Sequence, residues 1–293
     1  MLERVVISLT TLPHRYPVLL ETLRSLQAQT VQVAAIYLGL PQTCARTNAT
    51  YPPLPREIEQ LVTIVPLEVD HGPICKLLAA LEVEHTATTH IITVDDDVIY
   101  APNFVEALLL EAQRYPAIVI ASSGFRIGGG FPFYSSYSNC QGAWNRWTSF
   151  NFEAEVASVD VVAGFSGVLY PRHVLDKDEL IQVAQYSQAT RTNDDVVISA
   201  VVKGSKLVSK RIPAPLPQGR APDPQALSYF PKEFLLRLLA AVKDCQSLGY
   251  FAQPVPQVGY ATLAEIILWL LFFALLFGIA LVGWFLYVRS SAS

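Results

Sequence analysis

The alternation of short apolar strands with amphipathic helices is the feature that most limits the fold of this chain. Across residues 4–125, β-branched segments such as "RVVISLT" (4–10) and "HIITVDDD" (90–97) alternate with segments whose apolar residues recur at a helical period, such as "YPVLLETLRSLQAQT" (16–30). Strands that alternate with helices form βαβ units, in which helices cover both faces of a parallel sheet. The sequence therefore predicts an α/β fold with a Rossmann-like sheet.

Three consecutive aspartates end one of the predicted strands. Asp95, Asp96 and Asp97 lie at its carboxyl end, where open α/β sheets bind their ligands. Neighbouring carboxylates repel one another and are costly to desolvate unless a cation or hydrogen bonds compensate. Because side chains alternate along an extended chain, Asp95 and Asp97 point the same way and are candidate ligands for Mg²⁺ or Mn²⁺. The alternative is a solvated strand end without a metal.

A second acidic pair begins a predicted helix in "NDDVVISA" (193–200). Capping of the helix N-terminus is one explanation, and it accounts for one acid better than for both. The other explanation is catalytic, because a carboxylate beside an attacking hydroxyl can take its proton. We expect Asp195 to carry that role ahead of Asp194.

The C-terminal region has a different character. Residues 266–288, "IILWLLFFALLFGIALVGWFLYV", contain no charged residue and as a helix would span about 34 Å, enough to cross a bilayer. The sequence thus predicts a transmembrane helix over 263–289 and a short tail over 290–293. Residues 212–262 are expected to be a Pro-rich linker and an amphipathic helix, lying on the domain or on the membrane surface.

These features give an expected localisation and exclude one class of partner. The N-terminus carries no signal peptide, so we expect a single-pass membrane protein held in the lipid bilayer by its C-terminal helix, with the catalytic domain cytosolic. The net charge of −4 gives no electrostatic support for binding nucleic acid.

Five segments, taken in order, resemble the family 2-like glycosyltransferases of the nucleotide-diphospho-sugar transferase superfamily. The segments are "ISLTTLPHRYPVLLETLRSLQAQT", "HGPICKLLAAL", "IITVDDDVIY", "GFSGVLYPR" and "NDDVVIS", and the resemblance covers about residues 5–210. It implies a GT-A fold with a mixed sheet over residues 1–211. It also implies metal-dependent, inverting transfer of a single sugar from a nucleotide-diphosphate sugar, a UDP-sugar being favoured. The acceptor would be a hydroxyl of a glycan, lipid or protein.

The resemblance implies roles for individual residues. Asp95 and Asp97 would hold Mn²⁺ or Mg²⁺, and Asp195, with Asp194 beside it, would be the catalytic pair. The residues implied to bind the nucleotide sugar are Thr10, Thr11, Pro13, Arg15, Asp70, Lys76, Asp95, Asp96, Gly164, Phe165, Ser166 and Gly167.

The chain also departs from the family pattern. The acid that often follows the second strand is replaced by "YLGLP" (37–41), so Asp70 is the candidate substitute. The segment "WNRW" (144–147) lies before the acidic pair rather than after it, which favours a single transfer over polymerisation. The loop over 128–147 is expected to select the sugar and the acceptor.

Two other functions stay open at this point. A nucleotidyltransferase also uses clustered acids on an α/β sheet, but it should carry an early basic glycine-rich loop, which "SLTTLPHR" (8–15) is not. A catalytically inactive GT-A-fold binding or scaffold protein would keep the sheet without the chemistry. Both acidic sites are intact, which favours the enzyme.

Overall fold

The computed structural model describes residues 4–127, 136–138, 155–217, 223, 225–226 and 231–251. All of them belong to one compact unit, Met1–Gln253, and a second unit, Pro254–Ser293, lies outside the described residues. The predicted specificity loop at 128–147 lies outside them as well, apart from residues 136–138.

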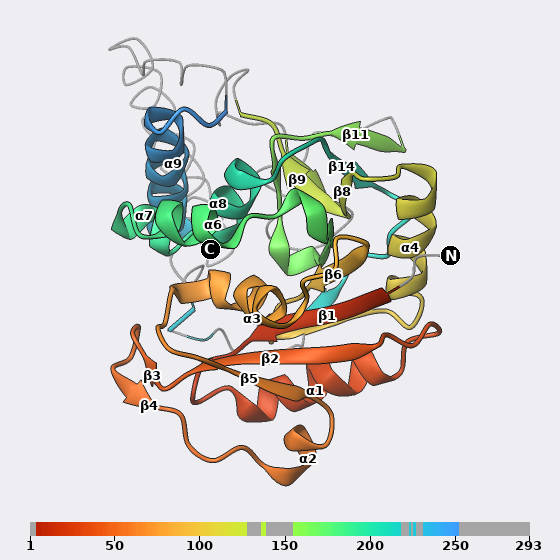
Figure 1. The fold of residues 1–293 in the computed structure, drawn as a ribbon, viewed down its shortest axis with the longest axis vertical. Coiled ribbons are helices and arrows are strands. Elements are labelled where there is room, and N and C mark those ends of the chain that lie inside the picture. The colour runs from red at the N-terminus through yellow and green to blue at the C-terminus, as the bar shows by residue number, and fades with distance from the viewer. Residues whose placement is uncertain are drawn as a thin grey trace, which may run out of the picture. The chain divides into compact units, whose positions relative to one another are not determined.

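An eight-stranded mixed sheet forms the centre of the described unit (Figure 1). Its strands, in spatial order, are β11 (Val156–Ser158), β14 (Lys206–Ser209), β8 (Val119–Ala121), β13 (Val168–Pro171), β6 (Thr89–Thr93), β1 (Arg4–Thr10), β2 (Ala35–Pro41) and β5 (Thr63–Leu67). Strands β6, β1, β2 and β5 are mutually parallel, whereas β13 runs antiparallel to both of its neighbours. The sheet is therefore Rossmann-like in its N-terminal half and mixed beyond β6.

Smaller sheets and helices surround this centre. The remaining described strands are β3 (Thr43–Cys44) with β4 (Ala49–Thr50), β7 (Val98–Ile99) with β15 (Leu216–Pro217), and β9 (Ser123–Phe125) between β10 (Ser136–Ser138) and β12 (Val161–Val162). The described helices are α1 (Tyr16–Gln27), α2 (Arg56–Glu59), α3 (Cys75–Val83), α4 (Phe104–Arg114), α6 (Lys177–Ala184), α7 (Gln188–Arg191), α8 (Asp194–Val201) and α9 (Pro231–Ser247). Short 3-10 turns are η1 (Gly72–Ile74), η2 (Gly164–Ser166) and η3 (Arg172–Val174).

Alternation along the strands creates two apolar cores, one on each face of the sheet. Val6 of β1 packs with residues of α3, α6, α8 and α9 in one core, while Ile7 and Leu9 pack with α1 and α4 in the other. Figure 1 shows α1 and α2 on one side of the sheet and α3 on the other. The predicted covering of both faces is found in the structure.

Helix α3 packs very close to the sheet. A Cβ added at Gly39 of β2 would lie 2.9 Å from both the Ala79 Cβ and the Cys75 carbonyl oxygen. The hydroxyl of Ser8 in β1 also donates a 2.5 Å hydrogen bond to the Lys76 carbonyl. These contacts fix the start of α3, and with it Lys76, against the carboxyl ends of the parallel strands.

One part of the predicted fold class is wrong. The prediction added a C-terminal transmembrane helix to the α/β domain. None of the helices in the described part of the chain has the length and apolar character needed to cross a membrane. The predicted span, 263–289, lies outside that part. Helix α9, which the sequence allowed on the domain or on a membrane surface, packs against α7 and α8 of the domain.

A buried carboxylate ties β1, β2 and the end of α3 together, and it supports a prediction about stability. Glu84 accepts hydrogen bonds from the Arg4 guanidinium at 2.8 Å and from the Tyr37 hydroxyl at 2.7 Å. Burial alone would raise the pKa of Glu84, but these hydrogen bonds outweigh it and lower the pKa. Glu84→Gln is therefore expected to reduce the free energy of unfolding at pH 7 by about 1–3 kcal/mol.

The pH dependence of this effect distinguishes charge from packing. A carboxylate with a lowered folded pKa stabilises the protein above its unfolded pKa, and that contribution disappears as the pH falls through the folded value. The free energies of unfolding of the wild type and Glu84→Gln, measured in urea, should therefore become equal in acid. If the two free energies differed by the same amount at pH 7 and at pH 3, the charge of Glu84 would not be the cause.

Candidate functional site

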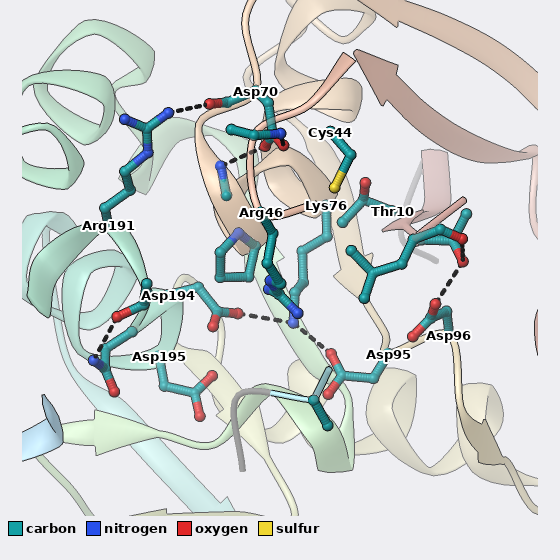
Figure 2. A pocket seen from close by; sticks show the side chains of 18 of the residues that line it. Thr10, Cys44, Arg46, Asp70, Lys76, Asp95, Asp96, Arg191, Asp194 and Asp195 are labelled. Carbon is teal, nitrogen blue, oxygen red and sulfur yellow. Dashed lines mark hydrogen bonds and ion pairs between the residues drawn. The ribbon is translucent and has the colours of Figure 1, made fainter. Parts of the chain in front are cut away.

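A cavity of about 880 Å³ opens at the carboxyl ends of the parallel strands. Its walls come from the ends of β1, β5 and β6, from the β3–β4 hairpin, and from α3, α7, α8 and α9. Figure 2 shows acids and bases from both halves of the domain directed into it. The cavity joins the two acidic clusters that are nearly a hundred positions apart in the sequence.

The middle aspartate of the cluster is bound by residues at the end of β1. The Thr11 hydroxyl donates to Asp96 Oδ2 at 2.5 Å, and the Arg15 guanidinium donates to Asp96 Oδ1 at 2.9 Å. Arg15 also lies 3.2 Å from Asp97 Oδ2 and binds Asp223 through a second nitrogen at 2.6 Å. Asp96 is thus a buried anchor for Arg15, whereas Asp95 is paired with Lys76.

The Lys76 ammonium connects the two acidic clusters. It forms an ion pair with Asp95 and another, at 2.8 Å, with Asp194 (Figure 2). Burial would lower the pKa of Lys76, but the charges of Asp194 and Asp95 outweigh it and raise the pKa well above its usual value. Lys76 therefore remains charged and holds the clusters together.

The second acid of the pair has a different environment. The Gly164 N–H donates to Asp195 Oδ1 at 2.8 Å. A Cβ at position 164 would lie 2.7 Å from that oxygen and 3.3 Å from the Lys76 Nζ, so a larger residue would displace the Asp195 carboxylate. Burial, and then the charge of Asp194, raise the pKa of Asp195 well above that of an ordinary aspartate. Such a carboxylate has the basicity that a proton acceptor needs.

The first cluster offers a partial site for a divalent cation. Partial burial, and then the charges of Asp96 and Asp95, raise the pKa of Asp97 to about 6. Among the described residues, no group of three or more His, Cys, Asp and Glu side chains could hold a metal by itself. A cation bound here would take Asp95, now paired with Lys76, and Asp97, now 3.2 Å from Arg15, and its other ligands from water or phosphate.

The structure brings most of the predicted site residues together. Those that line the cavity are Thr10, Thr11, Arg15, Asp70, Lys76, Asp95, Asp96, Asp97, Phe165, Asp194 and Asp195. Gly164 reaches the site through its hydrogen bond to Asp195. Pro13, Ser166 and Gly167 are not in the lining; Gly167, at φ +77°, packs instead against Phe104.

Asp70 lies where a substitute for the missing acid was predicted, but its carboxylate is already bound. Oδ2 accepts from the Ala45 N–H at 2.6 Å, and Oδ1 accepts from the Gly72 N–H at 2.7 Å. These bonds join the β3–β4 hairpin to the turn before α3. Asp70 therefore stabilises the cavity wall through these two hydrogen bonds, without a ligand.

Several lining residues had no signal in the sequence. Arg46 and Tyr51 come from the β3–β4 hairpin and its exit, Arg191 from α7, and Phe234 and Leu238 from α9. The sequence predicts α9 as an amphipathic helix. Only the apolar face of this helix indicates that it packs on the domain. The hairpin segment "CARTNAT" (44–50) carries no comparable pattern.

Comparisons with known proteins give a limited result. No family model matches the chain, and no curated protein matches it. Among solved structures it is similar to that of GalNAc-T7 with UDP, GalNAc and Mn²⁺, at a TM-score of 0.49 and 11% sequence identity. The match covers 88% of this chain and 53% of that one, so the chain spans about half the length of the protein it matches.

Proposed function

We propose that the chain is a GT-A-type glycosyltransferase that moves a single sugar from a nucleotide-diphosphate sugar to an acceptor hydroxyl. The observation that carries this proposal is the single cavity in which Lys76 joins the acids after β6 to the acids that begin α8. One cluster suits the diphosphate end of a donor, and the other suits the proton of an acceptor. The mixed Rossmann-like sheet is compatible with such a fold.

The donor side is formed by the carboxyl ends of β1, β5 and β6. Thr10, Thr11 and Asp70 would line the nucleoside end, and a UDP-sugar is the favoured donor. Asp95 and Asp97 would hold Mn²⁺ or Mg²⁺, which when bound stabilises the negative charge that develops on the leaving diphosphate. Arg15 keeps Asp96 and Asp97 in place by its ion pairs, at 2.9 and 3.2 Å.

The acceptor side is formed by η2, α7, α8 and α9. The Gly164 N–H holds one oxygen of Asp195, so the other oxygen can accept the proton of the attacking hydroxyl. Asp194 is turned to Lys76 instead, at 2.8 Å, which favours Asp195 as the base. Attack by a hydroxyl deprotonated on this side inverts the anomeric centre in one step. The acceptor is a glycan, a protein or a lipid hydroxyl.

Donor binding in the presence and absence of metal tests the proposal. We expect one of UDP-, GDP-, CDP- or dTDP-sugars to bind the protein in calorimetry with Mn²⁺, and to bind at least about tenfold more weakly with EDTA. Asp97→Ala should reduce the Mn²⁺-dependent affinity about tenfold or more, since it removes one of two metal-binding carboxylates. The side chain of Asp97 is 42% exposed, so its removal should leave the fold intact.

Asp178→Ala is the matched control, because Asp178 is an exposed acid in the first turn of α6, outside the cavity. It should bind the donor as the wild type does. Sugar release from the bound donor then separates an enzyme from an inactive binding protein. Failure of a folded wild-type protein to bind any nucleotide sugar with Mn²⁺ would overturn the proposed function.

A further inference from the structure

We propose that Arg46, in the β3–β4 hairpin, binds the diphosphate of the donor. This inference rests on the proposed function and adds a residue that neither the sequence motifs nor the comparisons indicate. Arg46 lines the cavity, and Figure 2 shows its side chain running from the hairpin into it. Three features of the site support this role: the anchored hairpin, the charges in the cavity and the position of the guanidinium.

The hairpin holds Arg46 at a defined place. Thr43 pairs with Thr50 and Cys44 with Ala49, so residues 45–48 form the turn, with Asn48 at φ 53°. The Ala45 N–H is bound by the Asp70 carboxylate at 2.6 Å, immediately before Arg46. At the exit of the hairpin, the Tyr51 hydroxyl donates to the Thr11 carbonyl at 2.8 Å. The backbone of Arg46 is therefore held in place at the edge of the cavity.

The charges in the cavity leave Arg46 available for an anion. Arg15 and Lys76 are each bound to two or more carboxylates. Within the described ranges, Arg46 makes no ion pair with a carboxylate, and its guanidinium donates to the Gln225 carbonyl at 3.2 Å. Arg46 is also an exposed residue, so a ligand in the cavity can reach its positive charge. A phosphate would balance it.

The position of the guanidinium suits a diphosphate rather than an acceptor. Arg46 lines the cavity together with Asp70, after β5, and Asp95, and in Figure 2 its side chain extends from the side of Asp70 toward Asp95. This is the region between the expected nucleoside end and the expected metal end of the donor. Arg191 also lines the cavity, but its charge acts on His71 and Cys75, and Figure 2 shows it across the cavity from Asp96. A guanidinium binds phosphate oxygens through two parallel N–H groups, which also orients the leaving group.

Calorimetry with nucleotides lacking the sugar tests this role. The probes are UDP, GDP, CDP and dTDP with Mn²⁺, each compared with its nucleoside. For the diphosphate that the wild type binds, Arg46→Gln should lose about 10- to 100-fold in affinity, because a charged hydrogen-bonding pair is removed. Binding of the corresponding nucleoside should be unchanged. Arg46→Lys should lose less than Arg46→Gln, because the charge remains without the paired N–H groups.

Arg56→Gln is the matched control, since Arg56 is an exposed arginine at the start of α2, outside the cavity. It should bind the diphosphate as the wild type does. Equal affinities of Arg46→Gln and the wild type for the diphosphate would overturn the inference and leave the proposed function standing. An equal loss for the nucleoside and the diphosphate would also overturn it, because Arg46 would then act on the shape of the site. A wild type that binds no diphosphate would overturn the inference, and one that also binds no nucleotide sugar would overturn the proposed function.

Discussion

Replacing Asp195 by asparagine is expected to reduce sugar transfer by about 100- to 10,000-fold, the usual contribution of a general base. The amide oxygen of asparagine can still accept the Gly164 N–H bond that Asp195 Oδ1 now accepts at 2.8 Å. The variant should therefore fold, keep its site geometry and bind the donor with an affinity close to that of the wild type. The measurement is kcat for transfer at saturating donor, together with donor affinity by calorimetry.

The pH profile gives an independent readout of the same role. Asp195 must be ionised to accept a proton, and burial with the charge of Asp194 raises its pKa well above the usual value. Activity of the wild type should consequently fall with decreasing pH at values well above an ordinary aspartate pKa. Asp195→Asn should lack this acidic limb, and Asp178→Asn, at an exposed helix start, should retain both the rate and the limb. A fully active Asp195→Asn variant would exclude Asp195 as the base.

Much of the N-terminal half of the fold could be predicted because its signals are local. The apolar period of 2 in 4–10 and the helical period in 16–30 are visible in short windows, and both elements are found, as β1 and α1. The rule that ligands bind at carboxyl ends of parallel strands then placed Asp95 in the site. The antiparallel pairing of β13 with β6 and β8 had no such signal, because it joins segments that are far apart in the chain.

The roles of the individual site residues could not be predicted either, because the residues that contact one another are far apart in the chain. Strand alternation predicts that Asp96 points away from its two neighbours, but β6 ends at Thr93 and Arg15 contacts both Asp96 and Asp97. The prediction that Lys76 lies near the nucleotide did not indicate that its ammonium pairs with Asp95 and Asp194. Partners at such separations are set by how α3 and α8 pack on the sheet. Arg46 had no signal because a single arginine in a short turn is ordinary in any sequence.

Replacing Lys76 by methionine is expected to reduce the free energy of unfolding at pH 7 by about 3–5 kcal/mol, because it leaves the carboxylates of Asp95 and Asp194 unpaired in a largely buried site. The Lys76 side chain is 7% exposed, and that of Asp194 is 14% exposed. Methionine has a similar length, so the change removes charge more than volume. Urea unfolding measures the effect, which should shrink as the pH falls and the carboxylates gain protons.

Two further variants show whether the loss comes from the carboxylates. Lys177→Met removes the ammonium of a surface pair with Glu82, at 2.6 Å with side chains 33% and 40% exposed, and should cost no more than about 1 kcal/mol. Adding Asp194→Asn to Lys76→Met should recover part of the lost stability, since one of the unpaired charges disappears. If Lys76→Met cost no more than Lys177→Met, the ammonium would not hold the two acidic clusters together. The link between donor side and acceptor side would then have to come from the bound substrates.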